Sequence, residues 1–339
     1  MRFPYSLAFS LARYLIANRR AARDRFPLVL MLEPLHGCNL CCAGCGRVRE
    51  YADTRGQILS VQQCLAAVDD CGAPVVSICG GEPLIYPHLD ELLGALLRRG
   101  KHIYLCTNGL LLQRWVNRLP RDRRLMINVH LDGMERTHDA IVQRQGVFKA
   151  ATAGIRAARQ AGLLVYTNTT IYRQTDMHEI VVLLAYLEQL GVAGMMISPG
   201  YDYPCTQPPA GSDEAGMALR RAEIHDKFRQ VRHLLESFPL VASPLYLDFL
   251  CGQCELACAA WANPTYNVRG WRSPCYQIGQ THYPTYREFI EAADFDRYGP
   301  GRDPLCQDCL THCGFEPAAM LVANARPREL LRMIAWQLG

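Results

Sequence analysis

Cysteine is the most chemically versatile residue type in this chain of 339 residues, where it occurs 16 times. Cys38, Cys42 and Cys45 form a C-x3-C-x2-C triplet within the segment HGCNLCCAGCG. Three thiolates can bind three irons of a [4Fe-4S] cluster, which leaves the fourth iron without a protein ligand. The triplet therefore predicts a cluster with one iron open to a small molecule.

A zinc site is the competing interpretation of the triplet. Zinc favours four protein ligands and C-x2-C pairs, so the x3/x2 spacing favours the cluster. The neighbouring Cys41 also makes a C-x3-C pair with Cys45, but only Cys38, Cys42 and Cys45 have both spacings. We expect Cys41 to be a packing residue.

The triplet follows the first of six short apolar or β-branched runs, which alternate with helix-like segments. These runs cover residues 28–32, 75–79, 102–106, 127–131, 164–168 and 195–198. Most neighbouring runs are separated by the length of a βαβ unit, which indicates parallel strands. We therefore predict an α/β fold with a partial or open (β/α)6 barrel over residues 27–237, with its chemistry at the carboxyl ends of the strands.

Two further segments flank the predicted barrel. Residues 1–26 are predicted to form an amphipathic helix that either packs against the barrel or lies at a membrane surface; its apolar face carries Phe3, Leu7, Leu11, Tyr14 and Leu15. Residues 238–339 form a small cysteine-rich extension with a C-terminal helix. Seven cysteines fall between positions 251 and 313, and such a segment usually needs a metal to fold.

Local signals predict several element boundaries. Ser60 and Gln63 form a capping box, and Gly72 can end the helix that they begin. Residues 201–213 are rich in proline and glycine and predict a loop or lid, followed by a long helix near 214–237.

Composition excludes several classes of protein. The formal charge is only +4 without a long basic run, so nucleic-acid binding has no electrostatic support. No apolar stretch approaches the length of a transmembrane helix. The arginine-rich N-terminus does not resemble a signal peptide. We therefore expect a cytoplasmic protein whose thiolates bind metal in a reducing environment. If the first helix binds lipid, the protein would lie peripherally on the inner membrane.

The segment GGEP, which follows the second apolar run one βα unit after the triplet, completes a resemblance to the radical S-adenosylmethionine (SAM) superfamily. In that superfamily the methionine moiety of SAM binds the open iron, and the GGE backbone receives its amine. The resemblance implies that one electron cleaves SAM to a 5'-deoxyadenosyl radical. The expected cofactor-binding residues are Gly80, Gly81, Glu82, Asn108, Asn128, His130, Asn168 and Ser198.

The C-terminal cysteines resemble the auxiliary-cluster (SPASM/twitch-like) extension of many radical SAM barrels in its shortened form. The pattern C-x11-G-x4-C precedes C-x2-C-x3-C, and the resemblance implies a second [4Fe-4S] cluster, with structural zinc as the alternative. The candidate ligands are Cys258, Cys275, Cys306, Cys309 and Cys313. Cys251 and Cys254 form a further C-x2-C pair, which packing alone can explain.

Longer sequence segments resemble those of one family, the hopanoid-biosynthesis radical enzymes that make adenosylhopane. These segments include RFPLVLMLEPLHGCNLCCAGCGRV, IYLCTNGLLL, VHLDGMERTHD and NPTYNVRGW. The resemblance implies that the adenosyl radical adds to the alkene of hopene (diploptene), and that Cys106 then donates a hydrogen atom to the substrate radical. Cys79 is a second possible donor, whereas Cys64 and Cys71 are expected in the core.

Such a reaction implies particular partners. The substrate is an apolar triterpenoid, the electron donor is a protein such as a flavodoxin or ferredoxin, and a membrane surface is a further possible partner. A mainly apolar cleft should bind the substrate; candidate wall residues are Tyr201, Tyr203, Leu247, Phe249, Trp261 and Trp271. The Ala259-Ala260 pair departs from the Thr-Pro expected in the family.

Two alternative functions remain open. A radical SAM enzyme that modifies a peptide or another terpenoid can carry the same cysteine-rich extension. A peptide-modifying enzyme would be expected to have a recognition domain before the barrel, where this chain has about 27 residues. An iron-sulfur electron carrier without catalysis would have closed four-cysteine clusters. The three-cysteine triplet and GGEP argue against this interpretation.

Overall fold

The computed structural model describes residues 2–201 and 216–338. Their strands form one nine-stranded sheet in the order β6-β5-β4-β3-β2-β1-β7-β8-β9. Neighbouring strands from β1 to β6 are all parallel. The six strands are β1 (Val29–Leu32), β2 (Val75–Ile78), β3 (His102–Thr107), β4 (Leu125–His130), β5 (Leu164–Ile171) and β6 (Gly194–Pro199).

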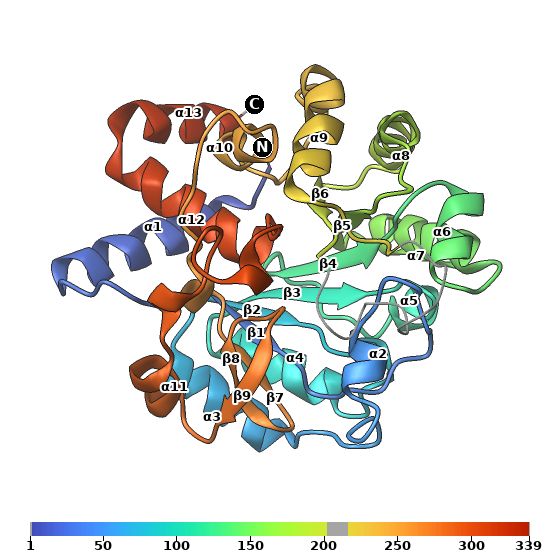
Figure 1. The fold of residues 1–339 in the computed structure, drawn as a ribbon. Coiled ribbons are helices and arrows are strands. Elements are labelled where there is room, and N and C mark those ends of the chain that lie inside the picture. The colour runs from blue at the N-terminus through green and yellow to red at the C-terminus, as the bar shows by residue number, and fades with distance from the viewer. Residues whose placement is uncertain (1, 202–215, 339) are drawn as a thin grey trace.

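Helices connect these parallel strands and cover the outer face of the sheet (Figure 1). Apolar side chains of the longer connecting helices are buried with those of the strands, which gives the barrel one continuous core. The connecting helices are α2 (Arg47–Glu50), α3 (Val61–Cys71), α4 (Leu89–Arg98), α5 (Leu112–Trp115), α6 (Glu135–Ile141), α7 (Val147–Gln160) and α8 (Met177–Gln189). The predicted α/β partial barrel is confirmed.

Helix α3 has the predicted boundaries. The Ser60 hydroxyl accepts a hydrogen bond from the backbone N–H of Gln63, and the Gln63 side chain accepts one from the Ser60 N–H. Gly72 ends the helix with φ of 69°, a left-handed backbone conformation that residues other than glycine rarely adopt. Cys64 and Cys71 are buried in the core, as predicted.

The C-terminal extension is more regular than its sequence suggests. Strand β7 (Thr265–Asn267) pairs in parallel with β1, and β8 (Gly270–Pro274) and β9 (Gly279–Tyr283) continue the sheet as an antiparallel ribbon. The cysteine-rich segment therefore contributes three strands to the sheet of the barrel. The extension joins the barrel through backbone hydrogen bonds to its first strand.

Further helices follow the sixth parallel strand. The long helix expected near 214–237 is shorter, and α9 begins only at Arg221; residues 202–213 of the predicted loop lie outside the described residues. The helices are α9 (Arg221–Leu235), α10 (Pro244–Leu250), α11 (Tyr286–Ala292), α12 (His312–Ala325) and α13 (Pro327–Leu338). Short 3-10 turns occur at Pro83–Ile85, Ala260–Ala262, Phe295–Arg297 and Pro304–Cys306.

Helix α1 (Tyr5–Arg20) crosses the amino ends of the barrel strands. Leu7 packs with Val75 and Met126, which lie near the starts of β2 and β4, and Leu15 is also buried. The expectation that this helix packs against the barrel is confirmed. Among the described residues, no helix has both the length and the apolar character needed to cross a bilayer.

Helix α12 covers the side of the barrel between β6 and β1. The backbone N–H of His312 donates to the Ser198 hydroxyl on β6 (3.3 Å), while Gly314 accepts from Ala259, close to the segment that leads to β1. Helix α13 then returns toward the N-terminus, so that the two chain ends lie side by side (Figure 1). There, Arg2 donates to the carbonyl oxygens of Trp336 and Gln337, and Gln337 donates to that of Phe3.

Candidate functional site

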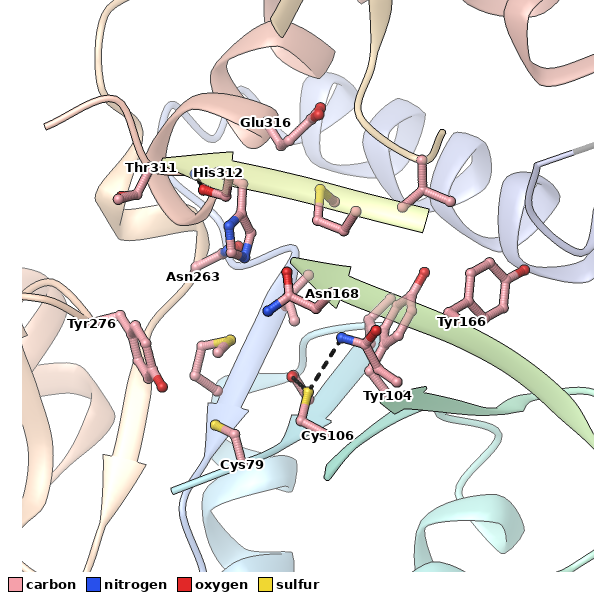
Figure 2. Close-up of a pocket in the computed structure, with 18 of the residues that line it drawn as sticks. Cys79, Tyr104, Cys106, Tyr166, Asn168, Asn263, Tyr276, Thr311, His312 and Glu316 are labelled. Carbon is pink, nitrogen blue, oxygen red and sulfur yellow. Dashed lines mark hydrogen bonds between the residues drawn. The ribbon is translucent and has the colours of Figure 1, made fainter. Parts of the chain in front are cut away.

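A cavity of about 870 Å³ runs through the interior of the barrel. At the carboxyl ends of the strands it is lined by Cys38, Cys42 and Cys45, and at the amino ends by α1. Helices α12 and α13 form the wall opposite the strands; Figure 2 shows His312 and Glu316 of α12 across the cavity from Cys79 and Cys106. The triplet therefore lies at one end of a long internal cavity.

The alternation of side chains along each strand determines which residues line this cavity. On β3, Tyr104 and Cys106 face inward, whereas Ile103 and Leu105 are fully buried beneath the helices. All eight expected cofactor-binding residues line the cavity. Its wall is apolar near the strand starts and polar near the strand ends; the apolar side chains include Val29, Val75, Leu7 and Leu11, and the polar ones include Asn128, His130, Asn168 and Thr170.

The cysteine triplet lies on the loop after β1, as predicted. Burial is the main influence on two of its thiols, and it raises the pKa of Cys38 to about 11 and that of Cys42 further. The nearby Cys45 adds to both shifts. Buried thiols of this kind become thiolate ligands when a cationic metal group neutralises their charge, which fits an iron-sulfur cluster.

The GGEP segment packs tightly against the loop of the triplet. The N–H of Gly81 donates to Leu35, and the N–H of Glu82 donates to Gly37, next to Cys38. A Cβ atom on Gly81 would lie only 1.7 Å from the Gly37 carbonyl oxygen. Glycine at this position is therefore required for the close approach of the two loops.

Glu82 anchors the GGEP segment to the end of β3. Its carboxylate accepts hydrogen bonds from the Thr107 hydroxyl (2.7 Å), the Asn108 N–H (2.8 Å) and the Leu84 N–H (2.9 Å). Burial raises its pKa, although these hydrogen bonds oppose the shift. The carboxylate thus connects the loops that follow β2 and β3.

The other rim residues have defined orientations. Asn108 donates to Asn39 on the triplet loop (2.7 Å), and His130 lies 2.6 Å from the buried carboxylate of Asp132. Burial tends to lower the pKa of His130, but the charge and hydrogen bond of Asp132 produce a net increase. The Asn168 side-chain oxygen is buried without a hydrogen-bond partner, so it can accept one from a ligand.

Cys106 lies where the polar and apolar parts of the wall meet. Its sulfur is 3.5 Å from the Ser77 hydroxyl and 3.8 Å from the side-chain nitrogen of Asn128. Burial raises the pKa of Cys106 despite these contacts. The group therefore stays a neutral thiol, the form that carries a transferable hydrogen atom.

The five cysteines proposed as second-site ligands surround one small cavity. Cys258, Cys275, Cys306, Cys309 and Cys313 all line it. Burial raises the pKa of each thiol, to about 11 for Cys306 and about 12 for Cys313. The residues of this site therefore suit a second metal group.

Neither cysteine site has the arrangement of a single-ion site. In the described ranges, no three His, Cys, Asp or Glu side chains are grouped as ligands of one metal ion. A four-iron cluster binds each thiolate through a different iron, so its ligands are farther apart than those of one zinc ion.

Several sequence expectations need correction. Tyr201 lines the cavity, but Leu247, Phe249, Trp261 and Trp271 do not; they pack in the core of the extension, and Tyr203 lies outside the described residues. Cys41 is exposed and is not a packing residue. Cys251 is buried and Cys254 half-buried, which agrees with a packing role for this pair.

Two functional candidates on α12 were missed. Burial raises the pKa of Glu316 to about 7, and its carboxylate accepts from the Ser243 N–H (2.7 Å). His312 has a buried ring nitrogen, Nδ1, without a partner, and burial lowers its pKa to about 4. Their spacing of four residues places both on one helix face. This spacing is visible in the sequence, where the segment was interpreted only by its cysteines.

A buried polar network that the sequence analysis also missed joins the triplet loop to the extension. The carboxylate of Glu33, just after β1, accepts from the Tyr51 hydroxyl (2.6 Å) and the Asn267 side chain (3.0 Å). Arg47, which follows the triplet, lies 3.6 Å from Glu33, and its guanidinium stacks 4.3 Å from the Tyr276 ring centre. The network fixes the triplet loop relative to β7.

Comparison with protein families divides the chain into two parts. Residues 32–187 match the model of the radical SAM superfamily, and residues 195–333 match a domain of unknown function, DUF3463. The first match covers the triplet, GGEP and Cys106. A radical SAM domain implies a [4Fe-4S] cluster and SAM, and this supports an enzyme rather than an electron carrier.

Individual relatives have diverse activities. GTP 3',8-cyclase 2 of Mycobacterium tuberculosis is 35% identical over 162 residues, which are 45% of either chain, so this chain spans less than half of that relative. The antilisterial bacteriocin subtilosin biosynthesis protein AlbA of Bacillus subtilis is 22% identical over 301 residues, 83% of this chain and 63% of the relative.

A solved structure shares the fold. The structure of Streptococcus suis SuiB bound to precursor peptide SuiA has a TM-score of 0.61 at 16% identity, over 87% of this chain and 69% of SuiB. At that identity the likeness extends to the fold alone. The sequence likeness to the radical SAM superfamily thus lies in residues 32–187, the part of the chain that contains the triplet, GGEP and Cys106.

Proposed function

We propose that this enzyme transfers the 5'-deoxyadenosyl group of SAM to the alkene of a hopene-type triterpenoid, which forms a carbon–carbon bond. The proposal rests on the resemblance of its sequence phrases to the adenosylhopane-forming enzymes and on one structural observation. That observation is the position of Cys106 at the junction between the polar rim and the apolar part of the cavity.

The two parts of the cavity suit two different ligands. Polar side chains near the triplet can hold the ribose and adenine of SAM, whereas the apolar walls near α1 suit a hydrocarbon skeleton. An alkene that enters from the apolar part would meet the adenosyl group beside Cys106. The thiol is then within reach of the carbon that must receive a hydrogen atom.

The cluster and SAM, when bound, supply the 5'-deoxyadenosyl radical. Addition of this radical to the alkene forms the new bond and leaves a carbon radical on the triterpenoid. Cys106 donates its hydrogen atom to that carbon and becomes a thiyl radical, which one electron and one proton return to the thiol. Each turnover thus consumes two electrons and one proton from an external donor, for which a flavodoxin or ferredoxin is suitable.

A second candidate is a radical SAM enzyme that modifies a peptide. The matches to AlbA and SuiB, which extend over 83% and 87% of this chain, favour it. Such an enzyme would use the radical to abstract hydrogen and would release free 5'-deoxyadenosine. The comparisons thus favour this second candidate, whereas the apolar walls of the cavity support the triterpenoid proposal.

Product analysis separates the two candidates. The anaerobically reconstituted holoenzyme should be incubated with SAM, a strong reductant and hopene, and the products examined by mass spectrometry. The proposal expects an adenosine–triterpenoid adduct that forms in step with methionine. Abundant free 5'-deoxyadenosine without any adduct would contradict the addition reaction.

A further inference from the structure

Exposed apolar side chains lie on the two helices that line the cavity at the end opposite the triplet. On α1, the side chains of Tyr5, Phe9 and Ile16 are 65%, 71% and 50% exposed. Their spacing places them on one helix face, opposite the buried Leu7 and Leu15. Helix α1 is therefore apolar on both faces, although the barrel covers only one of them.

Helix α13 has even less cover from the protein. It contains no buried residue, and Leu331, Ile334 and Leu338 are 67%, 48% and 59% exposed. Large apolar side chains gathered on a surface in this way usually mark a binding face. We call Tyr5, Phe9 and Ile16 with Leu331, Ile334 and Leu338 the α1/α13 surface.

The α1/α13 surface is continuous with the cavity. Tyr5, Ile334 and Leu338 belong to this surface and also line the cavity. Because their side chains are exposed, the cavity reaches the outside of the protein between α1 and α13. An apolar molecule that enters here would pass from the α1/α13 surface to Cys106 along the apolar part of the wall.

The charge on α1 favours an anionic lipid bilayer over a second copy of the chain as the occupant of this surface. The helix carries Arg13, Arg19 and Arg20, all exposed, and no acidic residue. A second copy of the chain docked symmetrically on α1 would bring these like charges close together. Anionic lipid headgroups would instead pair with the arginines while the apolar side chains enter the bilayer boundary.

We infer that the α1/α13 surface binds an anionic lipid bilayer and that the cavity takes its apolar substrate directly from the membrane through the mouth between the two helices. This inference rests on the proposed function for the identity of the substrate, but not for the binding to lipid. It assigns α1 and α13 a role in substrate capture, separate from the chemistry at the triplet.

Binding to vesicles tests the surface without any turnover. The holoenzyme should sediment with phosphatidylcholine vesicles that contain phosphatidylglycerol, bind less to phosphatidylcholine alone, and dissociate as salt increases. The variant Phe9→Ser/Ile16→Ser/Leu331→Ser should weaken this binding by about tenfold or more, since each side chain loses apolar burial. None of these three residues lines the cavity.

Matched variants control for general effects. Ile58→Ser/Val182→Ser alters side chains that are 46% and 55% exposed away from the α1/α13 surface, and it should bind vesicles like the wild type. Arg13→Gln/Arg20→Gln should reduce binding only to the anionic vesicles. Equal binding by the wild type and the triple variant would overturn the inference, and so would a wild-type dimer that the triple variant converts to monomers.

A second measurement links the surface to substrate capture. With hopene embedded in anionic vesicles, the triple variant should form adduct more slowly than the wild type, whereas with hopene dispersed in detergent the two rates should agree. Equal rates from vesicles would refute capture through this surface. Absence of adduct under both conditions, with vesicle binding intact, would instead refute the proposed reaction.

Discussion

The sulfur of Cys106 on β3 lies 3.5 Å from the hydroxyl oxygen of Ser77 on β2, with both side chains directed into the cavity. The contact places the thiol on the inner wall, between the triplet at one end and α1 at the other. Cys79, which also lines the cavity, offers a second thiol on the same side (Figure 2).

Replacement of the donor thiol should separate SAM cleavage from product formation. We expect Cys106→Ala to cleave SAM at a rate close to that of the wild type but to form about tenfold less saturated product, because the substrate radical lacks its hydrogen source. Both rates can be measured by anaerobic liquid chromatography with mass spectrometry. Cys79→Ala is the control, and a normal yield from Cys106→Ala with loss of yield from Cys79→Ala would reassign the donor.

The contact between the GGEP segment and the triplet loop should not tolerate a methyl group. Gly81→Ala would force the Gly37 carbonyl away, so we expect a loss of roughly 1–3 kcal/mol in stability and a lower iron content. Gly56→Ala, where an added Cβ meets no atom within 4 Å, should match the wild type in both. Thermal unfolding and iron analysis check this, and full iron content in Gly81→Ala would show that the loops can separate.

The carboxyl group of Glu316 should make stability depend on pH. Its pKa is raised from the ordinary value of 4.5 to about 7, mainly by burial, so the folded protein holds a proton that the unfolded chain has lost. Stability should therefore fall as pH rises from about 4.5 to 7, by up to roughly 3 kcal/mol for this group. Glu316→Gln should unfold at the same temperature as the wild type at pH 5 and at a higher one at pH 8; parallel pH profiles would exclude this role.

The cysteines of the second site should hold about half of the iron. We expect about eight irons per chain in the reconstituted wild type and about four in Cys309→Ser/Cys313→Ser, since the triplet cluster remains. Cys251→Ser, outside this site, should keep the full amount. Four irons with one zinc in the wild type would favour the structural zinc alternative.

Local patterns predicted much of the barrel and its site. The capping box of Ser60 and the left-handed Gly72 depend only on neighbouring residues. The triplet directly follows β1, the strand that the first apolar run predicts. Because side chains alternate along a strand, the polar residues that end β4 and β5 face the same cavity. Such features require no knowledge of distant parts of the chain.

Long-range contacts account for the errors. Strand β7 pairs with β1 across more than two hundred residues, and no local signal in its three residues specifies that partner. Trp271 is aromatic like a pocket wall, but it packs against Tyr266 and Tyr286 in the core of the extension. Whether an apolar residue faces a cavity or a core depends on tertiary packing, which aromatic character alone does not reveal.

The hydrogen bonds between Arg2 and the end of α13 have a practical consequence for purification. A purification tag fused ahead of Arg2 or after Leu338 would begin beside the mouth of the cavity, where it could obstruct substrate entry or adhere to the exposed leucines. Assays with lipid substrates should therefore use protein from which the tag has been cleaved.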